Sequence, residues 1–588
     1  MDIRALAGHY RAELWLCLAV LVLNVLFLNH VGVFDVDEAI YTEATREMIE
    51  SGDLVTPYYN YEYRWKKPPL TYWVMYPAQA VLGSTAGAAR LASAVQGALC
   101  ALLLALFGRF VFSRAAGLWA GAIFGTCFHG YIMGRGAVTD MTLVLWLTVC
   151  WLALFLADDR RSVPWMIVGG AAMGLATLTK GPLAIALCGG SWLTYLLLRR
   201  RVWTGIREPQ AWWGIVALLV VAAPWYWAIY ALHGTAFYEE FLGYHNVARF
   251  AQELEGHGGP IYTYLLMVFV LSAPWSGPVV ASQVRDLRAA WQRWRAKERA
   301  TRADRATLWL LVAFWLTMGL FSAAQTKLLN YIAPVYPLAA LLAGRYVAQL
   351  LDGELTVKPA TWWFLGGAGL LVIGGMGLVL ATAELWTGSL EVIQRELEVD
   401  RLVLGPSPLV AGIILLGGVV VVALIWRRGV TQRAFFALGS LGVTAAVLAW
   451  LTFMPVFYHY QEGTLRVMAI EAQRIAGPTG EIAALNLHWP SLTLTTQRRI
   501  EYYPATNEPD LPLDVLHAKL RRRFDQPRPI VMMSRKVREK DLLVGVQHYV
   551  WADRLGYKMI SNLPPPAGYE LPPSPSTEAQ VRRLQRGD

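Results

Sequence analysis

Apolar runs long enough to cross a membrane recur along the first 455 residues of the chain. A helix needs about 20 mostly apolar residues to span the hydrocarbon core of a bilayer. The pattern predicts a polytopic α-helical membrane protein with about thirteen spans. Their approximate ranges are 12–33, 88–108, 115–133, 140–157, 163–179, 181–198, 211–232, 261–281, 307–323, 331–350, 361–383, 406–426 and 434–455.

The pattern changes after residue 455, where no further run is long enough to span a membrane. Alternation typical of strands covers 481–487, 491–496, 499–503 and 529–533. Helix-like periodicity covers 462–476 and 512–524. We therefore predict a spanning domain at 1–455 and a small α/β domain at 456–588, with an irregular proline-rich tail near its end.

The first polar segment, Phe34 to Tyr72, crowds charges of both signs against the membrane domain. Within it, Glu38 to Glu50 has the periodicity of an amphipathic helix. We expect Asp35 or Asp37 to cap the start of this helix and Gly52 to end it. The apolar side holds Ile40, Ala44 and Met48, and the polar side holds Glu43, Arg46, Glu47 and Glu50. A short helix with a narrow apolar stripe is expected to lie on the membrane surface, followed by a second interfacial piece at 70–83.

Composition supports the membrane class. Only 16% of the 588 residues are charged and 56% are hydrophobic, whereas about a quarter of a soluble protein is charged. The net charge of +10 comes from arginines gathered in alternate loops, which the positive-inside rule places in the cytoplasm. With the N-terminus inside and thirteen spans, the first polar segment and the C-terminal domain face outward. Topology and anionic lipid account for the basic charge, so we expect no nucleic-acid partner.

Three carboxylates are candidates for catalysis: Asp37 and Glu38 in the first polar segment, and Asp140 where the fourth span begins. An acidic residue entering a span usually faces a cavity or a partner. Asp37 and Asp140 together could hold a divalent cation or orient a hydroxyl. The simpler alternatives are an acidic helix cap for Asp37 and Glu38, and an ion pair with nearby Arg135 for Asp140.

Several cations are predicted on the same outer side, against the usual charge bias. Lys66 and Lys67 run into Pro68 and Pro69, which hold the backbone extended. The other candidates lie at span ends or in the loop 233–260: Lys180, Lys327 and Arg249. A single outer lysine often extends to a headgroup, but lysines from three loops predict a site for a phosphate.

Four further residues are candidates for substrate binding: Tyr41, Trp225, His245 and His257. His245 lies four residues before Arg249, so the two would share one helix face. The alternatives are structural histidines in the loop 233–260 and a Trp225 that only packs within its span.

These motifs together resemble the GT-C glycosyltransferase superfamily, above all the bacterial aminoarabinose lipid A transferases and, more distantly, the protein O-mannosyltransferases. The resemblance rests on DEAIYTEATREMIESGD, KKPPLTYW, TDM at 139–141, TKGP at 179–182, PWYW at 224–227, HNVARF with EGHGGP, and KLLNYIAPVYP. It implies a sugar transfer, without nucleotide, from a polyprenyl-phosphate donor to an acceptor at the periplasmic leaflet of a bacterial inner membrane. Lipid A or another glycolipid or glycan is the favoured acceptor, and a protein acceptor is the alternative.

The resemblance also assigns roles. It implies Asp37 as the catalytic carboxylate with Asp140 as its partner, Lys67 and Lys180 near the donor phosphate, and inversion of the anomeric centre. One position departs from the family: the aminoarabinose transferases carry Glu-Lys-Pro-Pro where this chain has Lys66-Lys67-Pro68-Pro69. The departure leaves the sugar and the need for a cation open. A transporter for a polyprenyl-linked sugar is the second hypothesis, and a non-catalytic scaffold is the third.

Overall fold

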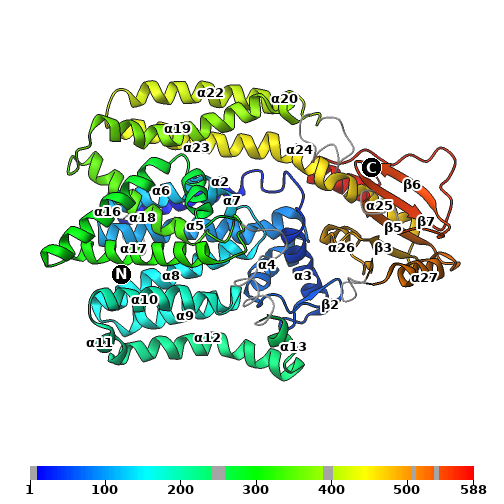
Figure 1. Cartoon of the computed structure of the whole chain (residues 1–588), viewed down its shortest axis with the longest axis horizontal. Helices are drawn as coiled ribbons and strands as arrows, with labels where there is room; N and C mark the ends of the chain where they lie inside the picture. The colour runs from blue at the N-terminus through cyan, green and yellow to red at the C-terminus, as the bar shows by residue number, and fades with distance from the viewer. Residues whose placement is uncertain (1–8, 242–258, 388–401, 505–510, 536–541, 588) are drawn as a thin grey trace.

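The computed structural model describes residues 9–241, 259–387, 402–504, 511–535 and 542–587, and most of them are helical. Long helices lie side by side over most of the molecule, and one sheet lies at the end that also holds the C-terminus (Figure 1). Helices α3 and α4 lie between these two parts. The candidate site therefore forms where the helical bundle meets the sheet region.

Every predicted span coincides with at least one helix. In the first half these are α2 (Arg11–Val25), α5 (Ala86–Val111), α6 (Arg114–Thr126), α7 (Phe128–Met133), α8 (Thr139–Arg160), α9 (Val163–Lys180), α10 (Leu183–Leu198) and α12 (Pro209–His233). Two short helices, α11 (Val202–Arg207) and α13 (Ala236–Tyr238), lie outside the predicted spans. In the second half they are α15 (Thr263–Leu271), α16 (Ser276–Ala296), α17 (Arg302–Ala323), α18 (Val335–Leu351), α19 (Pro359–Ala381), α20 (Ala383–Thr387), α22 (Pro406–Trp426) and α23 (Gln432–Leu448).

Length and composition make this a multi-pass membrane protein. Among the described residues, seven helices are long and apolar enough to cross a membrane, and two shorter apolar helices accompany them. The seven begin with Ala86–Val111 and end with the 45-residue run Gln432–Ala476. That run continues through π-helical turns (Ala449–Phe453 and His459–Gly463), α24 (Met454–Tyr458) and α25 (Thr464–Ala476). It passes the predicted domain boundary at residue 455 without a break.

Two predicted spans are each broken into a pair of helices, and the two breaks meet. The span at 115–133 divides at Cys127 into α6 and α7, and the span at 261–281 divides at Pro274 into α15 and α16. Proline has no backbone N–H to donate within a helix. The N–H of Phe128 donates to the carbonyl of Ala273 at 3.0 Å, so one break satisfies a group exposed by the other. Backbone groups inside a membrane need such partners.

The first polar segment forms α3 (Asp37–Ser51), a two-stranded ribbon of β1 (Tyr58–Tyr59) and β2 (Glu62–Tyr63), and α4 (Leu70–Leu82). Both predicted helices are present, and α3 ends at Gly52 with φ +70°, in the left-handed region that glycine favours. The predicted aspartate cap is wrong, because Val36 precedes the helix and no side chain caps its start. The polar side of α3 is not solvated as predicted, since Glu43 and Glu47 are buried.

The C-terminal region contains β3 (Glu481–Leu485), α26 (Pro490–Thr496), β4 (Glu501–Tyr503), α27 (Leu513–Phe524), β5 (Ile530–Arg535), β6 (Tyr549–Arg554), β7 (Tyr557–Ser561) and α28 (Glu578–Arg586). The sheet has the order β4-β3-β5-β7-β6. Strands β4, β3 and β5 are parallel, and β7 is antiparallel to both β5 and β6. Alternate residues of β3 face opposite sides, so Ile482 packs with α25 and Ala483 with α27.

The sequence pattern fails at three places in this region. Residues 491–496 alternate like a strand but form helix α26, whose seven residues are all buried. Proline is favoured in the first turn of a helix, where Pro490 lies. Because every residue of α26 is buried, the alternation of apolar and polar residues does not indicate one buried face of a strand. The hairpin β6–β7 and the helix α28 were not predicted.

Close helix packing yields a prediction about two glycines. A Cβ on Gly344 of α18 would lie 2.7 Å from the carbonyl oxygen of Ala116 in α6, whereas a Cβ on Gly319 of α17 would meet nothing within 4 Å. Gly344→Ala should therefore destabilise the protein by about 1–3 kcal/mol. Gly319→Ala should stabilise it by up to about 1 kcal/mol, because alanine favours helix. Thermal unfolding in detergent measures both, and shifts of the same sign would contradict this packing.

Candidate active site

The start of α3 is fixed by a buried ion pair between Glu38 and Arg90. One carboxylate oxygen of Glu38 accepts from Arg90 Nε at 2.9 Å and from the Ala137 N–H at 2.8 Å. The other accepts from Arg90 Nη2 at 2.6 Å and from the Phe34 N–H at 3.1 Å. Burial alone would raise the pKa of Glu38, but Arg90 holds it below its usual value. Both oxygens of Glu38 therefore have structural partners, which anchor the start of α3, and its catalytic role stays a prediction.

Arg90 extends this anchor to the loop between α2 and α3. Its guanidinium also donates to the backbone carbonyls of Leu28, Val31 and Gly32 at 3.1, 2.8 and 2.8 Å. One side chain on α5 therefore connects the end of the first helix, the loop and the start of α3.

Asp37, one residue before Glu38, is exposed instead of buried. Its side chain is exposed at the first position of α3, and within the described part of the chain its carboxylate makes no hydrogen bond or ion pair. Burial and then the charge of Asp37 raise the pKa of Tyr41 well above its usual value, and the charge of Asp140 adds to this. Tyr41 thus lies within the electrostatic reach of both candidate carboxylates, which come from different elements.

Tyr41 is held between aromatic and cationic side chains. It is buried and packs 5.8 Å from the ring of Tyr72 on α4. The Arg64 guanidinium lies 5.6 Å from the Tyr41 ring centre, and Arg64 Nε donates to the Tyr72 hydroxyl at 3.0 Å. The Asp37 carboxylate also acts electrostatically on Arg64. Sequence analysis did not select Arg64 or Tyr72, although both flank the Lys-Lys-Pro-Pro motif.

Asp140 pairs with Lys180 and not with Arg135. Lys180 Nζ lies 2.5 Å from one Asp140 oxygen, and Asn330 Nδ2 donates to the other at 2.7 Å. Both Asp140 and Lys180 are almost fully buried. Arg135 instead donates to the carbonyls of Leu23 and Asn24. The structure therefore brings two predicted site residues together, from the start of α8 and the end of α9.

Residues between α17 and α18 complete this side of the site. Besides Asn330, Tyr331 lies with its ring 5.1 Å from Lys180 Nζ. Lys327 from the same segment donates to the carbonyl of Ala324 at 2.6 Å and is half-buried. The motif KLLNYIAPVYP was part of the predicted site through Lys327. Asn330 of the same motif, which contacts Asp140, was not predicted.

The lysine pair lies directly before α4. Lys66 is exposed and Lys67 is half-buried. Burial and then the charge of Lys66 lower the pKa of His488, so Lys66 faces the C-terminal sheet region.

Trp225 packs against neighbouring side chains, which is the structural alternative to a role in substrate binding. It is buried, its ring lies 5.2 Å from that of Phe237, and its Nε1 donates to the Val55 carbonyl at 2.9 Å. His245, Arg249 and His257 lie outside the described residues.

Whether the site could hold a divalent cation depends on which side chains are free to bind one. Groups of three or more His, Cys, Asp or Glu side chains able to hold a metal are absent from the described ranges. Both oxygens of Asp140 are occupied by Lys180 and Asn330, and an ammonium at 2.5 Å stands where a cation would bind. Asp140 therefore does not fit a cation in this arrangement, and the need for a cation stays a prediction.

The C-terminal region buttresses the loop that leads to Asp37. The Ser491 N–H donates to an Asp35 oxygen at 2.8 Å, and the Asp35 N–H donates to Glu462 at 3.1 Å. Arg466 Nη2 donates to the Val33 carbonyl at 3.1 Å. Burial raises the pKa of Asp35 to about 6, against the lowering effects of Ser491 and Arg466.

Comparisons with known proteins agree with this geometry. A family model described as dolichyl-phosphate-mannose-protein mannosyltransferase matches residues 66–227. An undecaprenyl phosphate-α-4-amino-4-deoxy-L-arabinose arabinosyl transferase from Aeromonas salmonicida is 30% identical over 61% of this chain and 64% of its own length. A relative with the same description from Pseudomonas savastanoi pv. phaseolicola is 28% identical over 91% of this chain and 98% of its own. The alignment to the Aeromonas protein thus spans less than two thirds of that relative.

Solved structures decide the fold. ArnT from Cupriavidus metallidurans bound to undecaprenyl phosphate superposes with a TM-score of 0.72 at 24% identity, covering 96% of this chain and 99% of that one. The chain has the GT-C fold and resembles the aminoarabinose transferases. The oligosaccharyltransferase AglB from Archaeoglobus fulgidus aligns more distantly, with a TM-score of 0.51 at 12% identity over 90% of this chain and 70% of its own. The resemblance read from the motifs is thereby confirmed.

The two neighbouring carboxylates Asp37 and Glu38 should respond differently to neutralisation. Glu38→Gln leaves the buried Arg90 charge uncompensated, which typically costs about 3–5 kcal/mol. Asp37→Asn removes an exposed carboxylate at a helix start and should cost no more than about 1 kcal/mol. Thermal unfolding and yield in detergent compare the pair directly. Similar melting temperatures for both variants would show that Glu38 is not the anchor.

The buried contacts of Asp35 with the C-terminal region should make the stability of the protein depend on pH. Because the folded pKa of Asp35 is about 6, above its ordinary 3.8, its ionised form destabilises the fold as pH rises through that range. Asp35→Asn should therefore stabilise the protein at pH 8, by on the order of 1–3 kcal/mol, and much less at pH 4.

Asp53→Asn is the matched control for this effect. N–H groups of Thr56 and Val55 hold the pKa of Asp53 below its usual value despite partial burial. Its replacement should destabilise the protein at pH 8. An equal gain from Asp35→Asn at both pH values would contradict the assigned cause.

Proposed function

We propose that this chain is a polyprenyl-phosphate-sugar-dependent glycosyltransferase that uses Asp37 on its acceptor. One observation carries the proposal. Of the three candidate carboxylates, Glu38 and Asp140 are buried and paired, whereas Asp37 is exposed beside Tyr41 and Arg64. A carboxylate that has no hydrogen-bond or ion-pair partner among the described residues is available to a hydroxyl. The resemblance to aminoarabinose transferases and the GT-C fold support the same reaction class.

The proposed reaction is a single displacement. An acceptor hydroxyl oxygen attacks the anomeric carbon of the sugar while the bond from that carbon to the phosphate oxygen breaks. Asp37 takes the hydroxyl proton, and the electron pair leaves with the polyprenyl phosphate. The anomeric centre is inverted because the attack comes from the side opposite the leaving group.

Cations stabilise the phosphate as its charge grows. We assign this role first to Lys67, with Lys66, Lys327 and Arg249 as further donors. Lys180 uses one of its three N–H groups on Asp140, so two remain for a phosphate oxygen. Asp140 then positions Lys180 and keeps it charged, instead of acting on the acceptor itself.

The location follows from the charge pattern. We propose thirteen spans, a cytoplasmic N-terminus and a C-terminal α/β domain in the periplasm of a bacterial inner membrane. Arginines at the far ends of α5 and α8 support this orientation, since the candidate site lies at their other ends. Lipid A or another glycolipid or glycan is the proposed acceptor.

Asp37→Asn should abolish transfer without unfolding the protein. Loss of a general base typically lowers the rate by about 10²–10⁴-fold. Purified protein in detergent is mixed with a polyprenyl-phosphate sugar and a lipid acceptor, and the product is measured by mass spectrometry. Wild-type turnover in this variant would remove the central claim.

The same assay separates the enzyme from the alternatives. Transfer in detergent needs no membrane, whereas transport across a bilayer does, so a transporter would give no product in micelles. Lipids and glycoproteins from a deletion strain, compared by mass spectrometry, distinguish a glycolipid acceptor from a protein one.

A further inference from the structure

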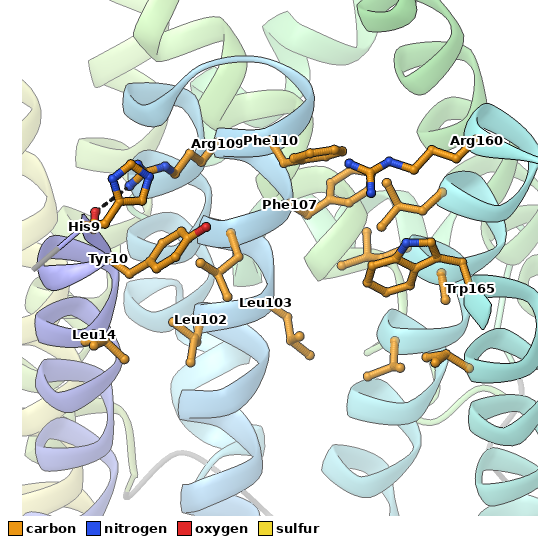
Figure 2. A pocket seen from close by; sticks show the side chains of 16 residues that line it. His9, Tyr10, Leu14, Leu102, Leu103, Phe107, Arg109, Phe110, Arg160 and Trp165 are labelled. Atoms are coloured by element: carbon orange, nitrogen blue, oxygen red, sulfur yellow. Dashed lines mark hydrogen bonds between the residues drawn. The ribbon is translucent and has the colours of Figure 1, made fainter. Parts of the chain in front are cut away.

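An apolar groove of about 870 Å³ lies at the end of the bundle opposite the candidate site. It is lined by α2, α5, α8 and α9, and Figure 2 shows leucines and Phe107 along its walls. Arg109 and Arg160, near the ends of α5 and α8, flank its mouth. Arg90 and Asp140 of the candidate site lie at the starts of the same two helices. The groove volume is in the upper part of the usual 300–1,000 Å³ range for ligand sites.

The two arginines at the mouth are not equivalent. Arg109 Nη1 lies 2.7 Å from the buried carboxylate of Glu13, which also pairs with Arg114 Nε at 3.5 Å. Arg160 is exposed, and its guanidinium stacks 4.2 Å from the centre of the Phe110 ring. No ion pair joins Arg160 to a carboxylate within the described part of the chain.

The nearest carboxylates in the sequence are already committed. Asp158 pairs with Arg199 and Arg201, and Asp159 pairs with Arg302 and Arg305. Among the described residues, Arg160 therefore adds to the groove mouth a positive charge that is not paired with a carboxylate.

Aromatic residues mark the depth of the groove mouth. Tyr10 and Trp165 lie on its two sides near the arginines (Figure 2). Tyrosine and tryptophan gather where a protein crosses the headgroup region of a bilayer. An apolar cavity that opens at this level beside a cation suits a molecule with an anionic head and a hydrocarbon tail.

We propose that this groove binds one anionic phospholipid, with its phosphate at Arg160 and an acyl chain between α5 and α8. Basic pockets between spanning helices are known sites for anionic headgroups. The unpaired guanidinium of Arg160 suits the single charge of a phosphodiester. A phosphomonoester such as a polyprenyl phosphate carries more charge and would call for several cations, as at the opposite face. The inference does not depend on the proposed sugar transfer.

The test uses the full chain in neutral detergent, titrated with phosphatidylglycerol and followed by native mass spectrometry. One arginine near an anionic headgroup contributes about 1 kcal/mol, so Arg160→Gln should weaken binding about fivefold. Arg161→Gln is the matched control, because it removes the same charge one residue away from a side chain that does not line the groove. Its affinity should equal that of the wild type. Thermal unfolding of both variants checks that the fold is kept.

A second variant addresses the tail. Leu103→Trp fills the groove from a half-buried position and should reduce phosphatidylglycerol binding while Arg160 is retained. Equal affinity for phosphatidylcholine, or equal loss in Arg160→Gln and Arg161→Gln, would overturn the proposal in favour of unspecific annular lipid. Displacement of phosphatidylglycerol by an equimolar polyprenyl phosphate would also overturn it, because the groove would then be a second site for the carrier lipid.

Discussion

The ion pair between Glu38 and Arg90 is the constraint on which the candidate site depends. A buried carboxylate and a buried guanidinium are each costly, and the pair persists because every donor and acceptor finds a partner. Those partners are backbone groups of the α2–α3 loop and of Ala137, just before α8. The pair therefore sets the position of α3 relative to α5 and α8, and with it the distance between Asp37 and Asp140.

A division of labour among the acidic residues follows from this anchor. Glu38 orders the helix start, Asp140 orders Lys180, and Asp35 connects the loop to Ser491 and Glu462 of the C-terminal region. Each of these three side chains makes a structural contact. These three residues hold the helix start, Lys180 and the loop in place around Asp37. The Asp37 carboxylate is therefore not needed for the fold and can stay exposed. The C-terminal region thus contributes to the site through the backbone of residues 33–35 and the Asp35 carboxylate.

Sequence predicted the helices well because membrane length and apolar periodicity are local properties. It also selected Asp37, Asp140 and Lys180, since charges at span ends are expensive wherever they occur. Pairings were harder. Arg135, five residues from Asp140, was the natural partner along the chain, yet Lys180, forty residues away, takes that place. The charged face of α3 and the strand-like segment 491–496 failed for one reason: a second layer of protein covers both, and its presence is not a local property.

The resemblance implies a glutamate at the position of Lys66, and the place of Lys66 in the fold indicates what the change from an acid to a base would do. It is exposed, and its charge acts on His488 of the C-terminal region. A glutamate there would attract the ammonium group of an amino sugar, whereas a lysine repels it. The same lysine attracts a phosphate or an acidic acceptor. The fold and the carboxylate that the site leaves exposed argue for sugar transfer, but the charge at residue 66 argues against carrying the relatives' amino sugar over to this chain.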